Sequence, residues 1–356
     1  MNRRPYIDWL RGLAVLIMIE AHTLDSWTRV ADRSSPWYRN AIIVAGFGAP
    51  LFLFLAGVAS MLAAGARTGK GLTTGEVVLA ALRRGAWIFL LAFLFRLQSL
   101  VLGGGQFPQS LLKVDILNVM GVSMIVGALG LALARTATVR LLLFTALTAA
   151  CAMLTPLVRQ TPLLSGLPDP LEAYLRPLRG LTTFTLFPWA GFFFGGCLVG
   201  MALEGAARLS LRVESWKSGV EQRWLALAGA ALALVGYLSS YLPPLFPGAS
   251  FWTSSPTFFF LRLGVLVLSV PVAFAVTKWW RGELLQEFGR ASLFVYWVHV
   301  ELVYGVLTAP IHRRLPLPLV FLAFAAFTVA MFGLVRLKTA IVSRGRSTKS
   351  MTAAQS

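Results

Sequence analysis

The strongest constraint on this chain is a series of ten apolar stretches, each long enough to cross a lipid bilayer as a helix. The hydrocarbon core is about 30 Å thick, and a helix needs about 20 apolar residues to cross it. The stretches lie near residues 8–28, 41–64, 77–97, 115–134, 140–158, 183–203, 224–242, 256–277, 291–310 and 316–335. Only 13% of the residues are charged, whereas a soluble domain has about 25%. The sequence therefore predicts an all-α, polytopic membrane helix bundle with about ten transmembrane helices.

The basic residues between these stretches predict how the bundle is oriented. Lys and Arg gather in the cytoplasmic loops of membrane proteins. If the N-terminus lies inside, the inner loops and tails hold roughly twice as many Lys and Arg residues as the outer loops. We therefore expect both termini in the cytoplasm, and an even number of spans agrees. The net charge of +18 resides mainly in these loops, so it does not indicate nucleic-acid binding.

The chain is expected to form one transmembrane domain, residues 1–338, followed by a basic cytoplasmic tail, residues 339–356. The tail is polar, and we expect it to be disordered and adsorbed to anionic lipid. Cys151 and Cys197 lie inside apolar stretches, which indicates small core residues and no disulfide framework. The sequence contains no CxxC or HExxH pattern, so no metal site is predicted.

The first apolar stretch carries unusual ionisable residues for a membrane span, among them Arg11, Glu20 and His22. It follows basic residues as a signal peptide would, but no small-residue cleavage site follows it, so we expect it to be retained. An ionisable group in hydrocarbon costs several kcal/mol, which makes function its first interpretation. On a continuous helix, Arg11 and His22 lie roughly 16 Å apart along the axis, near half a bilayer.

His22 is the candidate catalytic residue, because an imidazole is the usual general base for a hydroxyl or amine nucleophile. The alternative is a buried histidine bonded to a neighbouring carbonyl. Asp25, three residues later, is a candidate to orient the ring. Arg11 and Asp8 can pair one turn apart, and Arg11 is a candidate ligand for the phosphates of a donor. The alternative for Arg11 is an arginine that extends to the inner interface, neutralised by Asp8.

Polar residues at two other helix starts are candidate ligands as well. Asp115 and Asn118 share a face at the outer end of the fourth stretch, where they bind substrate hydroxyls or cap the helix. Ser254 or Ser255 is expected to cap the helix that starts at Pro256, and Ser255 is also a candidate for substrate binding. Arg262 lies about two turns inside that helix. We expect it to face a water-filled cavity and to help bind the donor.

The ninth stretch carries a polar stripe on an otherwise apolar helix. Tyr296 and His299 lie one turn apart on one face, with Ser292 a further turn below. Such a stripe faces a bundle interior, where it serves either packing or substrate binding. His312, in a short basic loop, is expected at the surface.

Several of these motifs resemble known membrane acyltransferases. Asp8-x-x-Arg11-Gly12 together with Arg11-x(10)-His22 resembles the signature of the type-three membrane acyltransferases. Two further segments are similar to landmarks of that group, Phe52–Gly57 and Gly289–His299. Val114–Leu117 and Trp252–Pro256 resemble the branch related to heparan-alpha-glucosaminide N-acetyltransferase. The resemblance runs from about residue 4 to residue 310.

This resemblance implies a bundle of about ten spans that takes an acyl group from cytoplasmic acyl-CoA. The group passes to an amine or hydroxyl, usually of a sugar, on the far side of the membrane. His22 would be the catalytic base or a transient acyl carrier, and Arg11 would help hold the donor. The loop from Thr23 to Asn40 contains no histidine, although the heparan branch places its catalytic histidine there. The mechanism therefore leans toward the bacterial O-acyltransferase pattern.

We expect a bacterial inner-membrane acyltransferase that uses acetyl-CoA, or another acyl-CoA, and no metal. Its acceptor would be an extracytoplasmic saccharide or glycolipid. The alternative from another class is a transporter of a lipid-linked or small anionic solute, with Arg11 and Arg262 as substrate ligands. The sequence leaves open the acceptor, the acyl chain length and the oligomeric state, with a homodimer among the alternatives.

Overall fold

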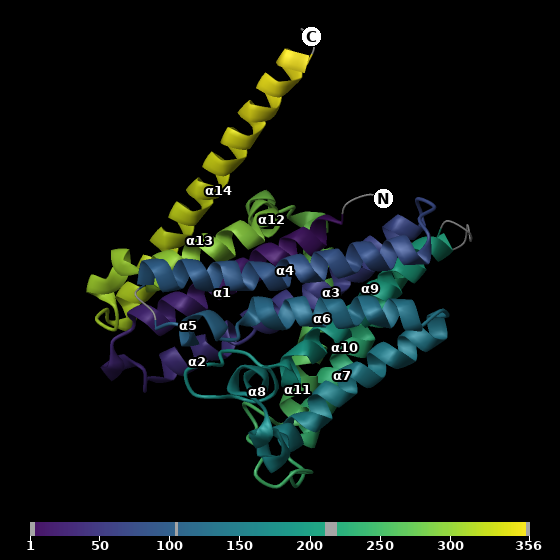
Figure 1. Ribbon diagram of the computed structural model, residues 1–356, viewed down its shortest axis with the longest axis horizontal. Helices are drawn as coiled ribbons and strands as arrows, with labels where there is room; N and C mark the ends of the chain where they lie inside the picture. The colour runs from purple at the N-terminus through teal and green to yellow at the C-terminus, as the bar shows by residue number, and fades with distance from the viewer. Residues whose placement is uncertain (1–3, 104–105, 211–218, 354–356) are drawn as a thin grey trace. The chain divides into compact units, whose positions relative to one another are not determined.

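The computed structural model describes residues 4–103, 106–210 and 219–353, and its regular elements are α-helices and short 3-10 helices (Figure 1). The contacts divide the chain into two compact units. The larger unit is formed mainly by Ala49–Trp280, and the smaller unit by Arg4–Gly48 together with Arg281–Ser356. The smaller unit therefore joins the two ends of the sequence.

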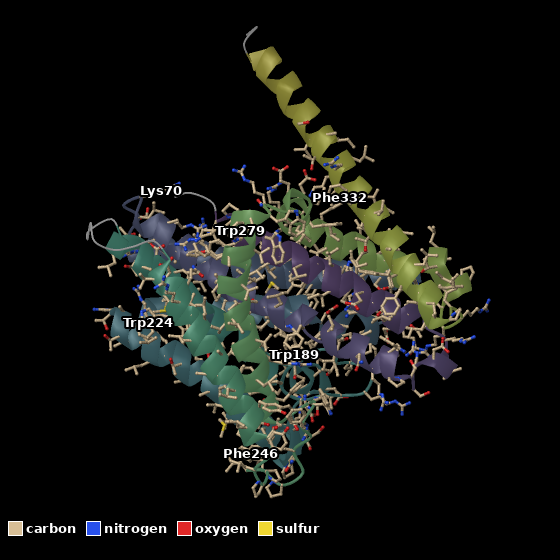
Figure 2. The ribbon with its side chains drawn as sticks, turned by 180° about the vertical axis from the view of Figure 1, so that it is seen from behind. Lys70, Trp189, Trp224, Phe246, Trp279 and Phe332 are labelled. Atoms are coloured by element: carbon tan, nitrogen blue, oxygen red, sulfur yellow. The ribbon has the colours of Figure 1, made fainter. Side chains whose placement is uncertain are left out.

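The helices of the larger unit follow one another along the chain. They are α3 (Gly48–Thr68), α4 (Thr74–Gly103), α5 (Gln109–Leu112), α6 (Ile116–Leu133), α7 (Ala137–Gln160), η2 (Pro162–Gly166), α8 (Asp169–Leu175), α9 (Leu186–Ser210), α10 (Val220–Ser239) and α11 (Pro256–Trp279). In Figure 2, Lys70, after α3, and Phe246, after α10, lie at opposite ends of this unit.

Glycines bring the helices of the larger unit into backbone contact. A Cβ atom at Gly57 of α3 would lie 2.0 Å from the carbonyl oxygen of Phe193 in α9, and one at Gly196 would lie 1.9 Å from that of Phe54. Between α10 and α11, a Cβ at Gly264 would lie 2.3 Å from the nitrogen of Ala233. Close approach at small residues is typical of helices in membranes, where packing rather than hydrophobic burial drives association.

The smaller unit consists of α1 (Pro5–Trp27), η1 (Val30–Asp32), α2 (Pro36–Ala45), α12 (Glu283–Arg290), α13 (Ser292–Tyr304), η3 (Val306–Ile311) and α14 (Leu317–Ala353). Here too glycines set the spacing. A Cβ at Gly12 of α1 would lie 1.9 Å from the carbonyl oxygen of Leu285 in α12, and one at Gly289 would lie 1.9 Å from that of Asp8. In Figure 1, α12 and α13 accompany α1 along its length.

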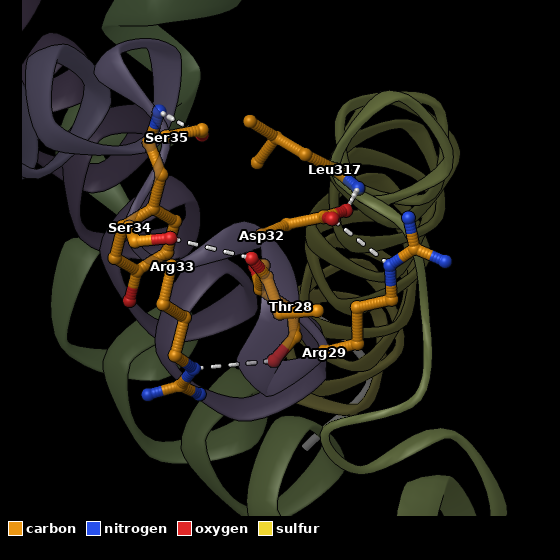
Figure 3. Close-up of polar contacts among 9 residues, drawn as sticks. Thr28, Arg29, Asp32, Arg33, Ser34, Ser35 and Leu317 are labelled. Carbon is orange, nitrogen blue, oxygen red and sulfur yellow. Dashed lines mark hydrogen bonds and ion pairs between the residues drawn. The ribbon is translucent and has the colours of Figure 1, made fainter.

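The loop after α1 is fastened to the start of α14 (Figure 3). Asp32 Oδ2 accepts a hydrogen bond of 2.7 Å from the Leu317 backbone N–H, and Asp32 Oδ1 accepts one of 2.9 Å from Arg29 Nε. The backbone N–H of Leu315 also donates to Trp27. The hydrogen bond from the Leu317 N–H is the main reason why the pKa of the Asp32 carboxyl is lowered, and the bond and charge of Arg29 lower it further. These contacts fix the end of α1 in the smaller unit.

The all-helical class predicted from the sequence is confirmed, and each of the ten apolar stretches overlaps a helix. Seven helices among the described residues are long and apolar enough to cross a membrane. They are Pro36–Thr68, Thr74–Val101, Ile116–Leu133, Ala137–Gln160, Leu186–Leu209, Pro256–Trp279 and Leu317–Ser343. The remaining predicted spans correspond to α1, α10 and α13. A count of ten and the cytoplasmic position of both termini stay predictions.

Two segments differ from what the sequence suggests. The expected inner loop between residues 277 and 291 contains α12, a short amphipathic helix that buries Leu285 and Phe288. Helix α14 continues to Ala353, through the segment expected to be a disordered tail. The division of the chain at residue 338 stays a prediction. Some residues lie outside the described part of the chain. They are residues 354–356 of the tail and three of the basic residues counted for the inner side, Arg3, Arg212 and Lys217.

Candidate active site

The smaller unit brings two of the three histidines into direct contact. His22 lies on α1 and His299 on α13, 277 residues further along the chain. His22 Nδ1 lies 2.7 Å from His299 Nε2. The two rings are nearly parallel, with their centroids 5.0 Å apart and an interplanar angle of 10°. The structure therefore joins the predicted catalytic base to a residue that the sequence offered as a substrate ligand.

The hydrogen-bond partners decide where the protons of this pair lie. His299 Nδ1 lies 2.7 Å from the carbonyl oxygen of Val295. A carbonyl only accepts, so His299 donates from Nδ1 and, when neutral, keeps its lone pair on Nε2. His22 then donates from Nδ1 to His299, and neutral His22 keeps its own lone pair on Nε2. His299 is completely buried, where an unpaired charge is costly, so we take it as neutral.

Aromatic and charged side chains surround the pair. The ring of Tyr304 meets that of His22 edge-on at 5.6 Å between centroids, and its hydroxyl donates to Asp25 Oδ2 at 2.9 Å. Asp25 also pairs with Arg33 at 3.8 Å. On the other side, the ring of Tyr296 lies edge-on to His299 at 6.1 Å. At Nδ1 of His22 the hydrogen-bond partner is His299, and Asp25 accepts from the Tyr304 hydroxyl beside it. An orienting role for Asp25 stays a prediction.

Tyr304 is a site residue that the sequence analysis did not single out. It lies five residues after His299 on the same helix, and no spacing rule for one face of a helix connects the two. Its only sequence signal is that a tyrosine hydroxyl in an apolar segment needs a polar partner.

Asp8 and Arg11 share the uninterrupted helix α1 with His22. The helical rise therefore separates Arg11 from His22 by roughly 16 Å along the axis, as expected. Asp8 is buried at the point where α1 meets Gly289 of α12. Roles for Asp8 and Arg11 in binding the donor stay predictions.

The predicted ligands Asp115 and Asn118 form the cap of α6 in the larger unit. Asp115 Oδ1 accepts from the Ile116 N–H, and Asn118 Oδ1 accepts from the Asp115 N–H at 2.9 Å, which completes a capping box. Asp115 Oδ2 also binds Arg96 Nη2 at 2.6 Å. The capping role is thus confirmed, and substrate binding stays a prediction. Burial, reinforced by the charge of Arg96, lowers the pKa of neighbouring Lys113.

Ser255 and Arg262 lie at the start of α11, in the same unit. Ser255 Oγ accepts from the Thr257 N–H at 3.2 Å, so the predicted cap is confirmed. The guanidinium carbon of Arg262 lies 4.1 Å from the ring centroid of Phe258. A cation over an aromatic face is a favourable contact. Substrate binding by Ser255 and donor binding by Arg262 stay predictions.

The comparisons with known proteins place the chain in a family. The family described as "Heparan-alpha-glucosaminide N-acetyltransferase, catalytic" matches residues 3–242, well over half of the chain. The chain belongs to this family. The match begins before α1 and ends after α10, so it includes His22, whereas His299 lies beyond it. No curated protein matches the chain significantly.

Membership in the heparan-alpha-glucosaminide N-acetyltransferase family confirms the resemblance to that branch expected from the sequence. The resemblance to the type-three membrane acyltransferases stays a prediction. It implies a membrane acetyltransferase, and the family uses acetyl-CoA as the donor of its acetyl group. Together with seven candidate spans among the described residues, this describes a multi-pass membrane protein of an acetyltransferase family.

Proposed function

We propose that the chain transfers an acetyl group from cytoplasmic acetyl-CoA to a hydroxyl or amine of a saccharide or glycolipid on the other side of a bacterial inner membrane. The observation that carries this proposal is the hydrogen bond between His22 Nδ1 and His299 Nε2. It sits within a chain of the heparan-alpha-glucosaminide N-acetyltransferase family.

His22 acts as the general base of the transfer. Its Nε2 lone pair takes the proton of the attacking hydroxyl or amine as that atom bonds to the carbonyl carbon of the thioester. The tetrahedral intermediate then breaks its carbon–sulfur bond, and the departing sulfur takes the proton back from Nε2. The products are the acetylated acceptor and CoA as a free thiol. A positioned base contributes about 10²–10⁴-fold to such a reaction.

His299 acts as a positioning residue. It accepts the Nδ1 proton of His22 and so keeps the lone pair on Nε2, the nitrogen that meets the acceptor. As positive charge forms on His22 during transfer, the hydrogen bond to a neutral imidazole strengthens. The bond from His299 Nδ1 to Val295 fixes the second ring in turn. An aspartate has the corresponding place in a serine protease triad.

The experiment is acetyl transfer by protein in lipid nanodiscs, with labelled acetyl-CoA and a panel of mono- and disaccharide acceptors. Release of free CoA thiol is followed in parallel. We expect His22→Ala to lower the turnover number by at least about 10²-fold.

The matched control is His312→Gln. His312 is half-buried rather than at the surface, and its Nε2 lies 3.1 Å from the carbonyl oxygen of Val303. Glutamine keeps a side-chain N–H for that contact, so turnover should stay near that of the wild type. Equal turnover in wild type and His22→Ala would overturn the role of His22. Uptake of an unaltered solute into vesicles, without thiol release, would favour the transporter instead.

A further inference from the structure

A cavity of about 270 Å³ lies within the larger unit, among α3, α4, α6, α7 and α9. Its lining includes two arginines, Arg140 of α7 and Arg208 of α9, and the carboxylate of Glu204. Pockets that hold small molecules usually have about 300–1,000 Å³. A volume just below this range suits a compact polar group better than a whole nucleotide cofactor.

The cavity lies at the ends of several candidate spans, where a membrane would carry its lipid headgroups. Its lining comes from the end of the candidate span Pro36–Thr68, the start of Thr74–Val101, the start of Ala137–Gln160 and the end of Leu186–Leu209. These ends lie together, near Lys70 in Figure 2. Apolar residues such as Met61 and Met201 line the deeper end of the cavity, further along their helices. The cavity is therefore polar toward the interface and apolar toward the hydrocarbon.

The polar groups of the cavity could bind both an anion, at the arginines, and a hydrogen-bond donor, at Glu204. Arg140 uses Nε to donate to the Ala134 carbonyl oxygen at 2.8 Å, which leaves its Nη groups for another acceptor. Glu204 accepts from Arg208 Nε at 3.0 Å through Oε1. Its other oxygen, Oε2, is buried with no hydrogen-bond partner among the described residues. A buried carboxylate oxygen without a donor is costly, so a ligand that supplies one is favoured.

We propose that this cavity binds the headgroup of a zwitterionic phospholipid, a phosphodiester that carries an ammonium group. The phosphodiester lies against Arg140 and Arg208, and the ammonium donates to Glu204 Oε2. The glycerol end and the first carbons of the acyl chains contact the apolar lining. Basic pockets between transmembrane helices bind the phosphate groups of anionic lipid headgroups. Here Oε2 of Glu204, which has no partner in the described part of the chain, adds a place for an ammonium group. The structural consequence is that the lipid ties five helices of the larger unit together.

The room for the carboxylate depends on a glycine. A Cβ at Gly65 of α3 would lie 2.2 Å from the carboxyl carbon of Glu204. The glycine therefore lets Glu204 lie against α3, in the wall of the cavity. Its neighbour Ala64 also lines the cavity and is buried.

The test is lipid retention by the purified full chain in detergent, measured by native mass spectrometry and by the shift in melting temperature. The probes are dioleoyl phosphatidylethanolamine, dioleoyl phosphatidylglycerol, CoA and inorganic phosphate. We expect the ethanolamine lipid to bind best. Arg140→Gln, which keeps an N–H for Ala134, and Glu204→Gln should each weaken it about tenfold or more, because each removes a charge-assisted hydrogen bond.

Two further variants keep this test decisive. Arg83→Gln removes an arginine of α4 that does not line the cavity, so lipid binding should be unchanged. Ala64→Leu fills the cavity without altering charge, so it should weaken binding. Equal retention in all variants would overturn the proposal. A rise in melting temperature with CoA or phosphate that depends on Arg140, in the absence of an effect of the ethanolamine lipid, would also overturn it. So would phosphatidylglycerol that binds as tightly as phosphatidylethanolamine and is unaffected by Glu204→Gln.

Discussion

Two polar clusters on the helices of this protein, one around Asp115 and one around His22, differ in what they do with their polar atoms. In the larger unit, both carboxyl oxygens of Asp115 are engaged, because one caps α6 and the other pairs with Arg96. In the smaller unit, His22 and His299 are joined by a chain of donors that ends at a carbonyl oxygen. That chain defines which nitrogen of His22 carries the lone pair. Both are polar and at least half-buried at their centres, but only the second holds a proton acceptor in a defined orientation.

The largest expected effect is on stability, from Asp115→Ala. The side chains of Asp115 and Arg96 are only 11% and 14% exposed. Removing one partner of a buried pair leaves an uncompensated charge and costs about 3–5 kcal/mol. We expect a large drop in the melting temperature measured in detergent. Asp115→Asn keeps an oxygen for the helix cap and should lose less. An unchanged melting temperature with a raised KM would instead identify Asp115 as a substrate ligand.

A smaller effect is expected where α1 and α12 touch. A Cβ at Gly12 would lie 1.9 Å from the backbone oxygen of Leu285, which no rotamer change can move away. Gly12→Ala should therefore cost about 1–3 kcal/mol by overpacking. It should also displace α12 from the helix that carries His22. Gly333→Ala is the matched control, because nothing lies within 4 Å of a Cβ there. Equal melting temperatures for the two variants would contradict the close contact.

These contacts show what the sequence can and cannot predict. The length and apolar character of the ten stretches predict a helix at each, because a segment that crosses a bilayer must be apolar and must satisfy its backbone hydrogen bonds internally. It does not predict α12, whose eight residues are too few for a periodic signal. The serine at the start of α11 is predicted as a cap from local spacing alone. The contact of His22 with His299 is not, since it joins residues 277 apart and depends on how two helices pack.

Tyr304→Phe tests whether the hydroxyl beside the histidine pair takes part in the reaction. The variant keeps the ring beside His22 but loses the hydroxyl that donates to Asp25. A single hydrogen bond contributes about 1 kcal/mol, so we expect at most about a fivefold fall in turnover. The measurement is the rate of thiol release at saturating acetyl-CoA. A loss as large as that of His22→Ala would make Tyr304 part of the chemistry.

The smallest effect concerns the loop that holds the end of α1. The pKa of Asp32 is lowered in the folded protein, chiefly by the Leu317 N–H. A lowered pKa contributes stability at pH values above the unfolded pKa of about 4, and that contribution is lost as pH falls through the folded pKa. The melting temperature of Asp32→Asn should lie slightly below wild type at pH 7, and the gap should close near pH 3. A gap that is the same at both pH values would exclude this linkage.

The most direct test of the account is a double-mutant cycle of turnover with His22→Ala, His299→Phe and the double variant. His299→Phe removes the acceptor for the Nδ1 proton and should lower turnover about 10–100-fold. His299→Gln should restore much of it, since its amide oxygen also accepts. The double variant should be no slower than His22→Ala alone, because His299 acts only through His22. Losses that multiply in the double variant, or wild-type turnover in His299→Phe, would contradict the account.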